Sequence, residues 1–144
     1  MHKPNVTVAA VVQYQDQFLF VEEKDKSLGN LVINQPAGHL ELNETLIEAC
    51  QRELFEETGL QLSPSGFIGT YRHLANNGTD YLRFCFYFKL EELSPLKPND
   101  PDIVRAFWAT LAQIEQSVFR SPLVLRCILD SQSRPLIALD YICG

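Results

Sequence analysis

The chain has 144 residues and a formal net charge of -6 at pH 7; hydrophobic residues make up 46% of it and charged residues 21%. This length and balance predict a single folded domain over residues 1–144 and exclude a disordered or fibrous chain. The negative charge argues against a nucleic-acid polymer as partner, because phosphate backbones are bound by a surplus of Lys and Arg.

The apolar stretches and the cysteines bear on where the protein resides. The opening residues have only Lys3 ahead of a short apolar run and no small-residue cleavage pattern, so no secretory signal is expected. No stretch approaches the roughly 18 apolar residues that a membrane span needs. The cysteines lack paired short spacings, which favours reduced thiols over a disulfide framework or a zinc site: Cys50, Cys85, Cys127 and Cys143. The sequence therefore predicts a cytoplasmic protein with no membrane partner.

The first part of the chain predicts strands. Residues 5–13 and 17–22 are rich in β-branched and aromatic residues and are separated by a short turn, which predicts a hairpin. After it we expect, in turn, a loop, a short extended stretch and chain breakers: residues 24–30, residues 31–34, and Pro36 with Gly38.

A helix is expected over residues 44–57. Asn43 is the predicted N-cap, and Gly59 stands just past the end, where a left-handed residue is favoured.

The rest of the chain alternates strands and helices. Residues 67–74 and 80–90 predict two strands joined by a turn, because Asn77-Gly78 between them is a strong turn signal. A Pro-rich acidic loop over residues 93–102 is followed by a strand and two helical segments: residues 103–109, 111–117 and 122–130. Strands that bracket helices in this way indicate a mixed α/β fold.

Three glutamates of the predicted helix occupy an unusual place. At about 100° per residue, Glu53, Glu56 and Glu57 fall on one arc beside the apolar stripe, with Glu57 at the edge of the buried side. Their mutual repulsion and the negative end of the helix dipole both disfavour this arrangement. Arg52 is the only cation of the helix, so a divalent metal is the natural counter-charge. An ordinary acidic surface is the alternative.

The same residues resemble the Nudix box, and every fixed position of that motif is matched: Gly38, Glu44, Arg52, Glu53, Leu54, Glu56, Glu57, Gly59 and Leu60. Such a match at fixed spacing is specific. It implies a Nudix hydrolase, in which a metal-activated water attacks phosphorus. The implied structure is the Nudix fold, a mixed β-sheet in an α/β/α sandwich.

The resemblance also implies roles for individual residues. The Gly38 carbonyl and the carboxylates of Glu53, Glu56 and Glu57 would bind Mg²⁺ or Mn²⁺. Arg52 would orient Glu53, which is the leading choice for the general base.

Two further carboxylates are assigned by the same resemblance. Glu44 would brace Arg52 or reach the metal through water. A late-loop carboxylate is expected to join the site or to act as the base instead; Asp102 is the first choice and Asp100 the alternative.

Other stretches resemble the NudJ-type phosphatases within this family: residues 4–9, 34–41, 82–84 and 120–123. This resemblance implies a monomer that releases phosphate from nucleoside tri- and diphosphates, or from hydroxymethylpyrimidine diphosphate. His39 is expected to contact a substrate phosphate or to be a surface hydrogen-bonding residue. Arg83 would meet a phosphate, stack on a base or form a cross-strand ion pair.

Two other functions fit the sequence. One is a Nudix pyrophosphatase acting on a dinucleoside polyphosphate, ADP-ribose or another diphosphate. The other is a non-catalytic binding module of the same fold.

Overall fold

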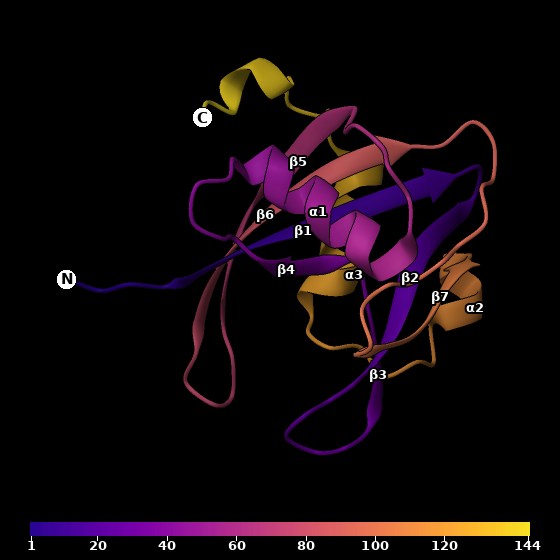
Figure 1. The fold of residues 1–144 in the computed structure, drawn as a ribbon, viewed down its shortest axis with the longest axis horizontal. Helices are drawn as coiled ribbons and strands as arrows, with labels where there is room; N and C mark the ends of the chain where they lie inside the picture. The colour runs from indigo at the N-terminus through magenta and orange to yellow at the C-terminus, as the bar shows by residue number, and fades with distance from the viewer.

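The computed structural model describes residues 1–144 and consists of one strand system flanked by helices (Figure 1). The strands are β1 (Asn5–Tyr14), β2 (Gln17–Lys24), β3 (Leu31–Asn34), β4 (Ala37–His39), β5 (Gly66–Leu74), β6 (Asp80–Lys89) and β7 (Ile103–Ala109). The helices are α1 (Leu46–Thr58), α2 (Leu111–Ile114) and α3 (Leu123–Ser133), followed by a 3-10 turn, η1 (Leu139–Tyr141). None of the helices has the length and apolar character that crossing a bilayer requires.

The sheet is mixed and divides around the first hairpin. Its strand order is β3-β2-β1-β6-β5, with β4 paired to β1 and β7 paired to β2. β1 and β6 run parallel, and every other pair is antiparallel. β1 pairs with β2 only at Gln13 and Tyr14, so the two strands separate beyond the turn and β4 takes the place beside β1.

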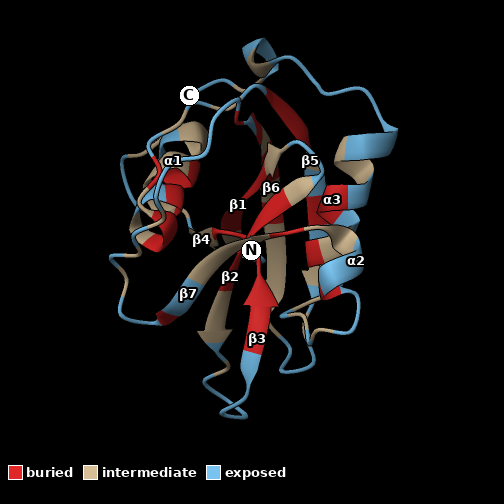
Figure 2. Cartoon of the chain, turned by 90° about the vertical axis from the view of Figure 1, so that its right-hand side faces the viewer, coloured by how far each residue is buried: buried red, intermediate tan, exposed pale blue.

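Helices cover both faces of this sheet. Figure 2 shows α1 on one side of the strands and α2 with α3 on the other, with the buried residues between them. Alternate residues of β1 enter the two cores, so that Val8 and Val12 pack on the α1 side while Ala9 and Val11 pack on the α3 side. The predicted α/β/α sandwich is therefore confirmed.

Helix α1 begins later than the sequence predicted. Thr45 is the N-cap: its side chain accepts from the Glu48 N–H at 3.1 Å, and Glu48 Oε1 accepts from the Thr45 N–H at 2.9 Å. The prediction of Asn43 was wrong, because Asn43 has φ +67° and the reciprocal Thr-x-x-Glu capping box lies two residues on. At the other end Gly59 has φ +80°, which confirms the predicted left-handed residue.

Other elements also differ from the sequence prediction. Pro36 and Gly38 were expected only as breakers, but Ala37–His39 form β4 because their backbone pairs with β1. Helix α2 stops at Ile114 instead of residue 117, since the chain soon afterwards pairs with β3 through Val118 and Arg120. α3 continues to Ser133, and η1 was not predicted.

The capping geometry gives a test of where the helix begins. Replacing Thr45 by Ala removes the side-chain acceptor and should lower the free energy of unfolding by about 1 kcal/mol. Replacing Asn43 by Gly should leave stability equal or slightly higher, because glycine adopts a positive φ without strain. Urea denaturation of both variants measures the two effects; a loss on changing Asn43 with none on changing Thr45 would restore Asn43 as the cap.

Candidate active site

Glu57 points into the protein near the end of α1. Its residue is only 5% exposed, and its Oε1 accepts a hydrogen bond from the Ala37 N–H of β4 at 2.9 Å. Burial raises the pKa of Glu57 to about 9, although the bond from Ala37 opposes the shift. The sequence placed this side chain at the edge of the buried face, and its position is confirmed. A buried carboxyl of this kind needs a proton or a cation.

Arg52 holds two carboxylates at once. Its Nε and Nη2 donate to the two oxygens of Glu44 at 3.0 and 2.7 Å, and its Nη1 donates to Glu53 Oε1 at 2.7 Å. Nη2 also donates to the His39 carbonyl at 2.9 Å, which joins α1 to the end of β4. The bidentate bond lowers the pKa of Glu44. Arg52 therefore fixes Glu53, and Glu44 is the brace for Arg52.

Gly38 and Glu53 are in direct contact. A side chain at Gly38 would collide with the Glu53 carboxylate and displace it, so glycine leaves the room in which this carboxylate lies against the strand. Burial raises the pKa of Glu53, while the bond from Arg52 lowers it. The carboxylate is thus half-desolvated and pressed against the backbone that bears the Gly38 carbonyl.

The donor set in this region consists of oxygen atoms. Glu53, Glu57, the 45%-exposed side chain of Glu56 and the Gly38 carbonyl all offer oxygen, the ligand type that hard divalent cations take. No group of three acidic, cysteine or histidine side chains is drawn together as a preformed metal centre. The close packing of Glu53 on Gly38 and the burial of Glu57 nevertheless fit a cation on chemical grounds, since each carboxylate lacks a dedicated positive partner apart from Arg52.

The late loop brings one of the two candidate aspartates to this helix. Asp100 donates its backbone N–H to the Glu56 carbonyl at 2.9 Å, and its negative charge is one of the influences that raise the pKa values of Glu53 and Glu57. Asp102 instead has a 66%-exposed side chain whose Oδ2 lies 3.6 Å from Lys26 Nζ. The structure thus brings Asp100, and not Asp102, toward the glutamates.

One acidic residue of this region was not predicted from the sequence. Glu23, at the bulged end of β2, accepts from Asn34 Nδ2 at 3.0 Å and pairs with Arg120 at 3.3 Å, both through Oε1. Its charge contributes to the raised pKa of Glu57. No local pattern marks it, because it follows Glu22 in an ordinary strand ending; only the fold brings it near the helix.

A cleft of about 630 Å³ opens beside these residues on the α3 side of the sheet. Gly38 and His39 line it, and so does Arg83 from β6. His39 is exposed there, while Arg83 is only 8% exposed and donates to Gln35 Oε1 at 3.1 Å. Arg83 therefore belongs to the cleft and does not form the cross-strand ion pair that was one of its expected roles.

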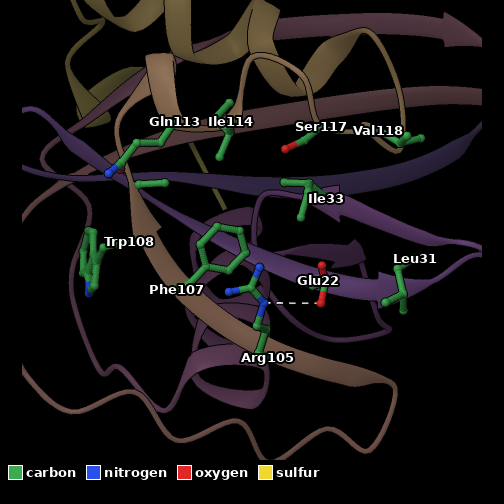
Figure 3. Close-up of a pocket in the computed structure, with 11 residues that line it drawn as sticks. Glu22, Leu31, Ile33, Arg105, Phe107, Trp108, Gln113, Ile114, Ser117 and Val118 are labelled. Carbon is green, nitrogen blue, oxygen red and sulfur yellow. Dashed lines mark hydrogen bonds and ion pairs between the residues drawn. The ribbon is translucent and has the colours of Figure 1, made fainter.

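A second cavity, of about 430 Å³, lies elsewhere, between β7, β3 and α2 (Figure 3). Arg105 occupies it, stacked 4.1 Å from the Phe107 ring centroid and paired with Glu22 at 3.3 Å. Because its one arginine is already neutralised and stacked, this cavity offers no free charged group.

Comparisons with known proteins agree with this site. The NUDIX domain family matches residues 1–127. The Escherichia coli K12 protein "Phosphatase NudJ" is 46% identical over 140 residues, covering 94% of this chain and 90% of its own. A NUDIX hydrolase from Nitrosomonas europaea has a TM-score of 0.91 and 41% identity, covering 99% of this chain and 97% of its own. The NUDIX domain of Shewanella oneidensis NrtR, solved with ADP ribose, shares the fold at a TM-score of 0.77 and 19% identity, covering 93% of this chain and 90% of its own.

The fold and the complete motif define a hydrolase that cleaves phosphoric anhydrides. The chain belongs to the Nudix family. Members of this family use divalent cations and act on small phosphorylated substrates.

The burial of Glu57 has a measurable consequence for stability without divalent cations. The folded protein keeps the Glu57 proton up to about pH 9, whereas the unfolded chain loses it near pH 4.3, so this residue makes stability fall as pH rises through that window. The variant Glu57→Gln lacks this effect. Denaturant titration in EDTA measures the free energy of unfolding of both proteins. The value for Glu57→Gln minus the value for the wild type should grow from pH 5 to pH 9.

Glu56→Gln is the matched control, because it makes the same change one residue away on a half-exposed side chain. It should follow the wild-type pH dependence. Equal pH profiles for the wild type and Glu57→Gln would show that Glu57 is not buried in solution.

Proposed function

We propose that this Nudix hydrolase is a Mg²⁺-dependent phosphatase of the NudJ type, which converts nucleoside tri- and diphosphates to monophosphates and releases phosphate. Hydroxymethylpyrimidine diphosphate belongs to the same substrate class. The supporting observation is the buried Glu57 beside an Arg52-held Glu53 and Gly38, in a chain 46% identical to Phosphatase NudJ.

The metal would be held by the Gly38 carbonyl and by Glu53, Glu56 and Glu57, with Mn²⁺ as an alternative ion. When bound, the cation lowers the pKa of a water molecule and neutralises charge on diphosphate oxygens. It also supplies the positive charge that a buried, ionised Glu57 needs.

The chain's own residues then have distinct tasks. Glu53 accepts the proton of the attacking water, a role suited to a half-buried carboxylate whose pKa is raised. Arg52 keeps Glu53 in place, and Glu44 holds the guanidinium so that this geometry survives substrate binding. His39 and Arg83, which line the cleft next to Gly38, contact the substrate.

The variants Glu53→Gln and Glu57→Gln should lower kcat by at least about 100-fold while the circular dichroism spectrum stays that of the wild type. Each keeps the size of the side chain and removes a charge that the metal and the water require. The control is Gln132→Glu on helix α3, on the other side of the sheet, which should keep the wild-type kcat. A Glu57→Gln enzyme with wild-type kcat would refute the ligand assignment.

We assign the late-loop carboxylate to Asp100 in place of Asp102. Asp100→Asn should weaken Mn²⁺ binding and lower kcat/KM by about tenfold or more, whereas Asp102→Asn should change neither by more than about twofold. Electron paramagnetic resonance titration with Mn²⁺ and steady-state kinetics measure the two effects. The reverse ranking would return the role to Asp102.

The products identify the type of phosphatase. Purified protein with Mg²⁺ should release orthophosphate from nucleoside tri- and diphosphates, and EDTA should abolish the release. Pyrophosphate from triphosphates, or cleavage of dinucleoside polyphosphates or ADP-ribose in preference, would favour a Nudix pyrophosphatase. No turnover on any substrate would favour the binding module.

We also infer a cytoplasmic monomer. Cys50, Cys85 and Cys127 are free and buried, in keeping with a reducing compartment. The residues assigned above to the metal and to the substrate lie together within one copy of the chain.

A further inference from the structure

Arg83 is the one arginine of the chain without an acidic partner. The others each have a guanidinium nitrogen within 4.0 Å of a carboxylate oxygen: Arg52, Arg72, Arg105, Arg120, Arg126 and Arg134. Arg83 is also 8% exposed, so it is the cation for which an uncompensated charge is most costly. A buried, unpaired guanidinium beside a cleft indicates an anionic ligand.

The position of the guanidinium is fixed by Gln35. The Gln35 side chain is fully buried, and its Nε2 donates to the Val124 carbonyl at 2.9 Å. This bond requires the amide oxygen to point the other way, where it accepts from Arg83 Nη1 at 3.1 Å. Arg83 thus has a neutral support that orients it without cancelling its charge.

The remaining donors of Arg83 are available to a ligand. The one protein oxygen to which it donates is Gln35 Oε1, and the guanidinium also lies near the Cys127 thiol. No buried side-chain nitrogen or oxygen in the protein lacks a partner, so Nε and Nη2, which bond to no oxygen, are not sealed inside the core, and Arg83 lines the cleft. Two adjacent N–H groups of a guanidinium match two oxygens of a phosphate.

The sheet register places this group at a defined separation from the metal-binding edge. Thr7 of β1 pairs with His39 on one side and with Arg83 on the other, so the three residues form a row on the same face. With adjacent strands about 5 Å apart, the backbones of His39 and Arg83 lie roughly 10 Å apart. A phosphorylated molecule in the cleft can therefore extend from Arg83 to His39 and to its neighbour Gly38, which also lines the cleft and approaches the Glu53 carboxylate.

Neither acidic residue that lines the cleft forms an ion pair with Arg83. Glu23 pairs with Arg120 at 3.3 Å, and Asp25 accepts from the Ser27 hydroxyl at 2.7 Å. Ser121 and Leu123, at the N-terminal end of α3, also line the cleft, and the positive end of that helix dipole adds to the attraction for an anion.

We propose that Arg83, supported by Gln35 and the N-terminal end of α3, forms a phosphate subsite separate from the glutamates that bind the metal. The ligand is a phosphate group of the diphosphate substrate, and in this respect the inference rests on the proposed function. Gln35 is a positioning residue: it makes the guanidinium available because it is an amide and not a carboxylate.

The decisive measurement is the binding of inorganic phosphate to the full-length protein in EDTA. Phosphorus NMR detects the binding. The wild type should bind inorganic phosphate saturably. Arg83→Gln removes the donors. Gln35→Glu keeps the side-chain size, gives up the bond to the Val124 carbonyl and gives Arg83 a carboxylate to pair with. Each should weaken binding by about tenfold or more. Arg105→Gln, in the cavity of Figure 3, makes the same charge change as Arg83→Gln and should leave binding unaltered.

Kinetics give a second readout. With Mg²⁺, Arg83→Gln and Gln35→Glu should each raise KM by about tenfold. Their kcat should change by less than about threefold, because the metal site is untouched. Adenosine monophosphate tested alongside inorganic phosphate distinguishes the source of the bound group: tighter, Arg83-dependent binding of the monophosphate assigns the subsite to the phosphate that stays on the product. Equal binding of both assigns it to the phosphate group alone.

The subsite and the proposed function fail in different ways. Absence of saturable phosphate binding by the wild type, or full binding by both Arg83→Gln and Gln35→Glu, overturns the subsite. Since Gln35→Glu leaves Arg83 in place, the test stands even where Arg83→Gln does not fold. Glu57→Gln should lose turnover but keep phosphate binding; retention of its turnover overturns the metal assignment and leaves the subsite standing.

Discussion

The fork of hydrogen bonds from Arg52 is the interaction on which the site depends. One guanidinium joins Glu44, just before α1, to Glu53 within that helix, and it also reaches the His39 carbonyl on β4. Without it, half-buried carboxylates of one helix would repel one another and the strand beside them. With it, the helix keeps a cluster of negative charge directed at the sheet, which is the condition for holding a divalent cation.

The end of α1 is stabilised in a related way. Lys97, Asn99 and Asp100 direct backbone N–H groups at the carbonyls of Thr58 and Glu56, so the late loop satisfies helix acceptors that would otherwise be unpaired. These donors also offset the negative end of the helix dipole just where the glutamates lie. The loop is thus both a cap for the helix and the carrier of a nearby carboxylate.

Much of this arrangement could be predicted from local pattern. The helical angle alone placed Glu57 at the buried edge, and the β-branched and aromatic residues of 5–13 and 17–22 predicted the first two strands. Prediction failed where two signals competed locally: Asn43 and Thr45 are both good caps, and only the Glu48 pairing decides between them. It also failed where the deciding contact is tertiary, as for Asp100 against Asp102, for Glu23, and for the Gln35 support of Arg83.

The parallel pairing of β1 with β6 has a consequence for how the protein folds. Asn5 to Gln13 align with Tyr81 to Lys89, so the strand that carries Arg83 can join β1 only after a long intervening chain has been closed into a loop. Contacts of such high sequence separation slow the formation of a native structure. The hairpin and α1 can form from neighbouring segments, and the cleft beside them is completed only when the distant strand docks.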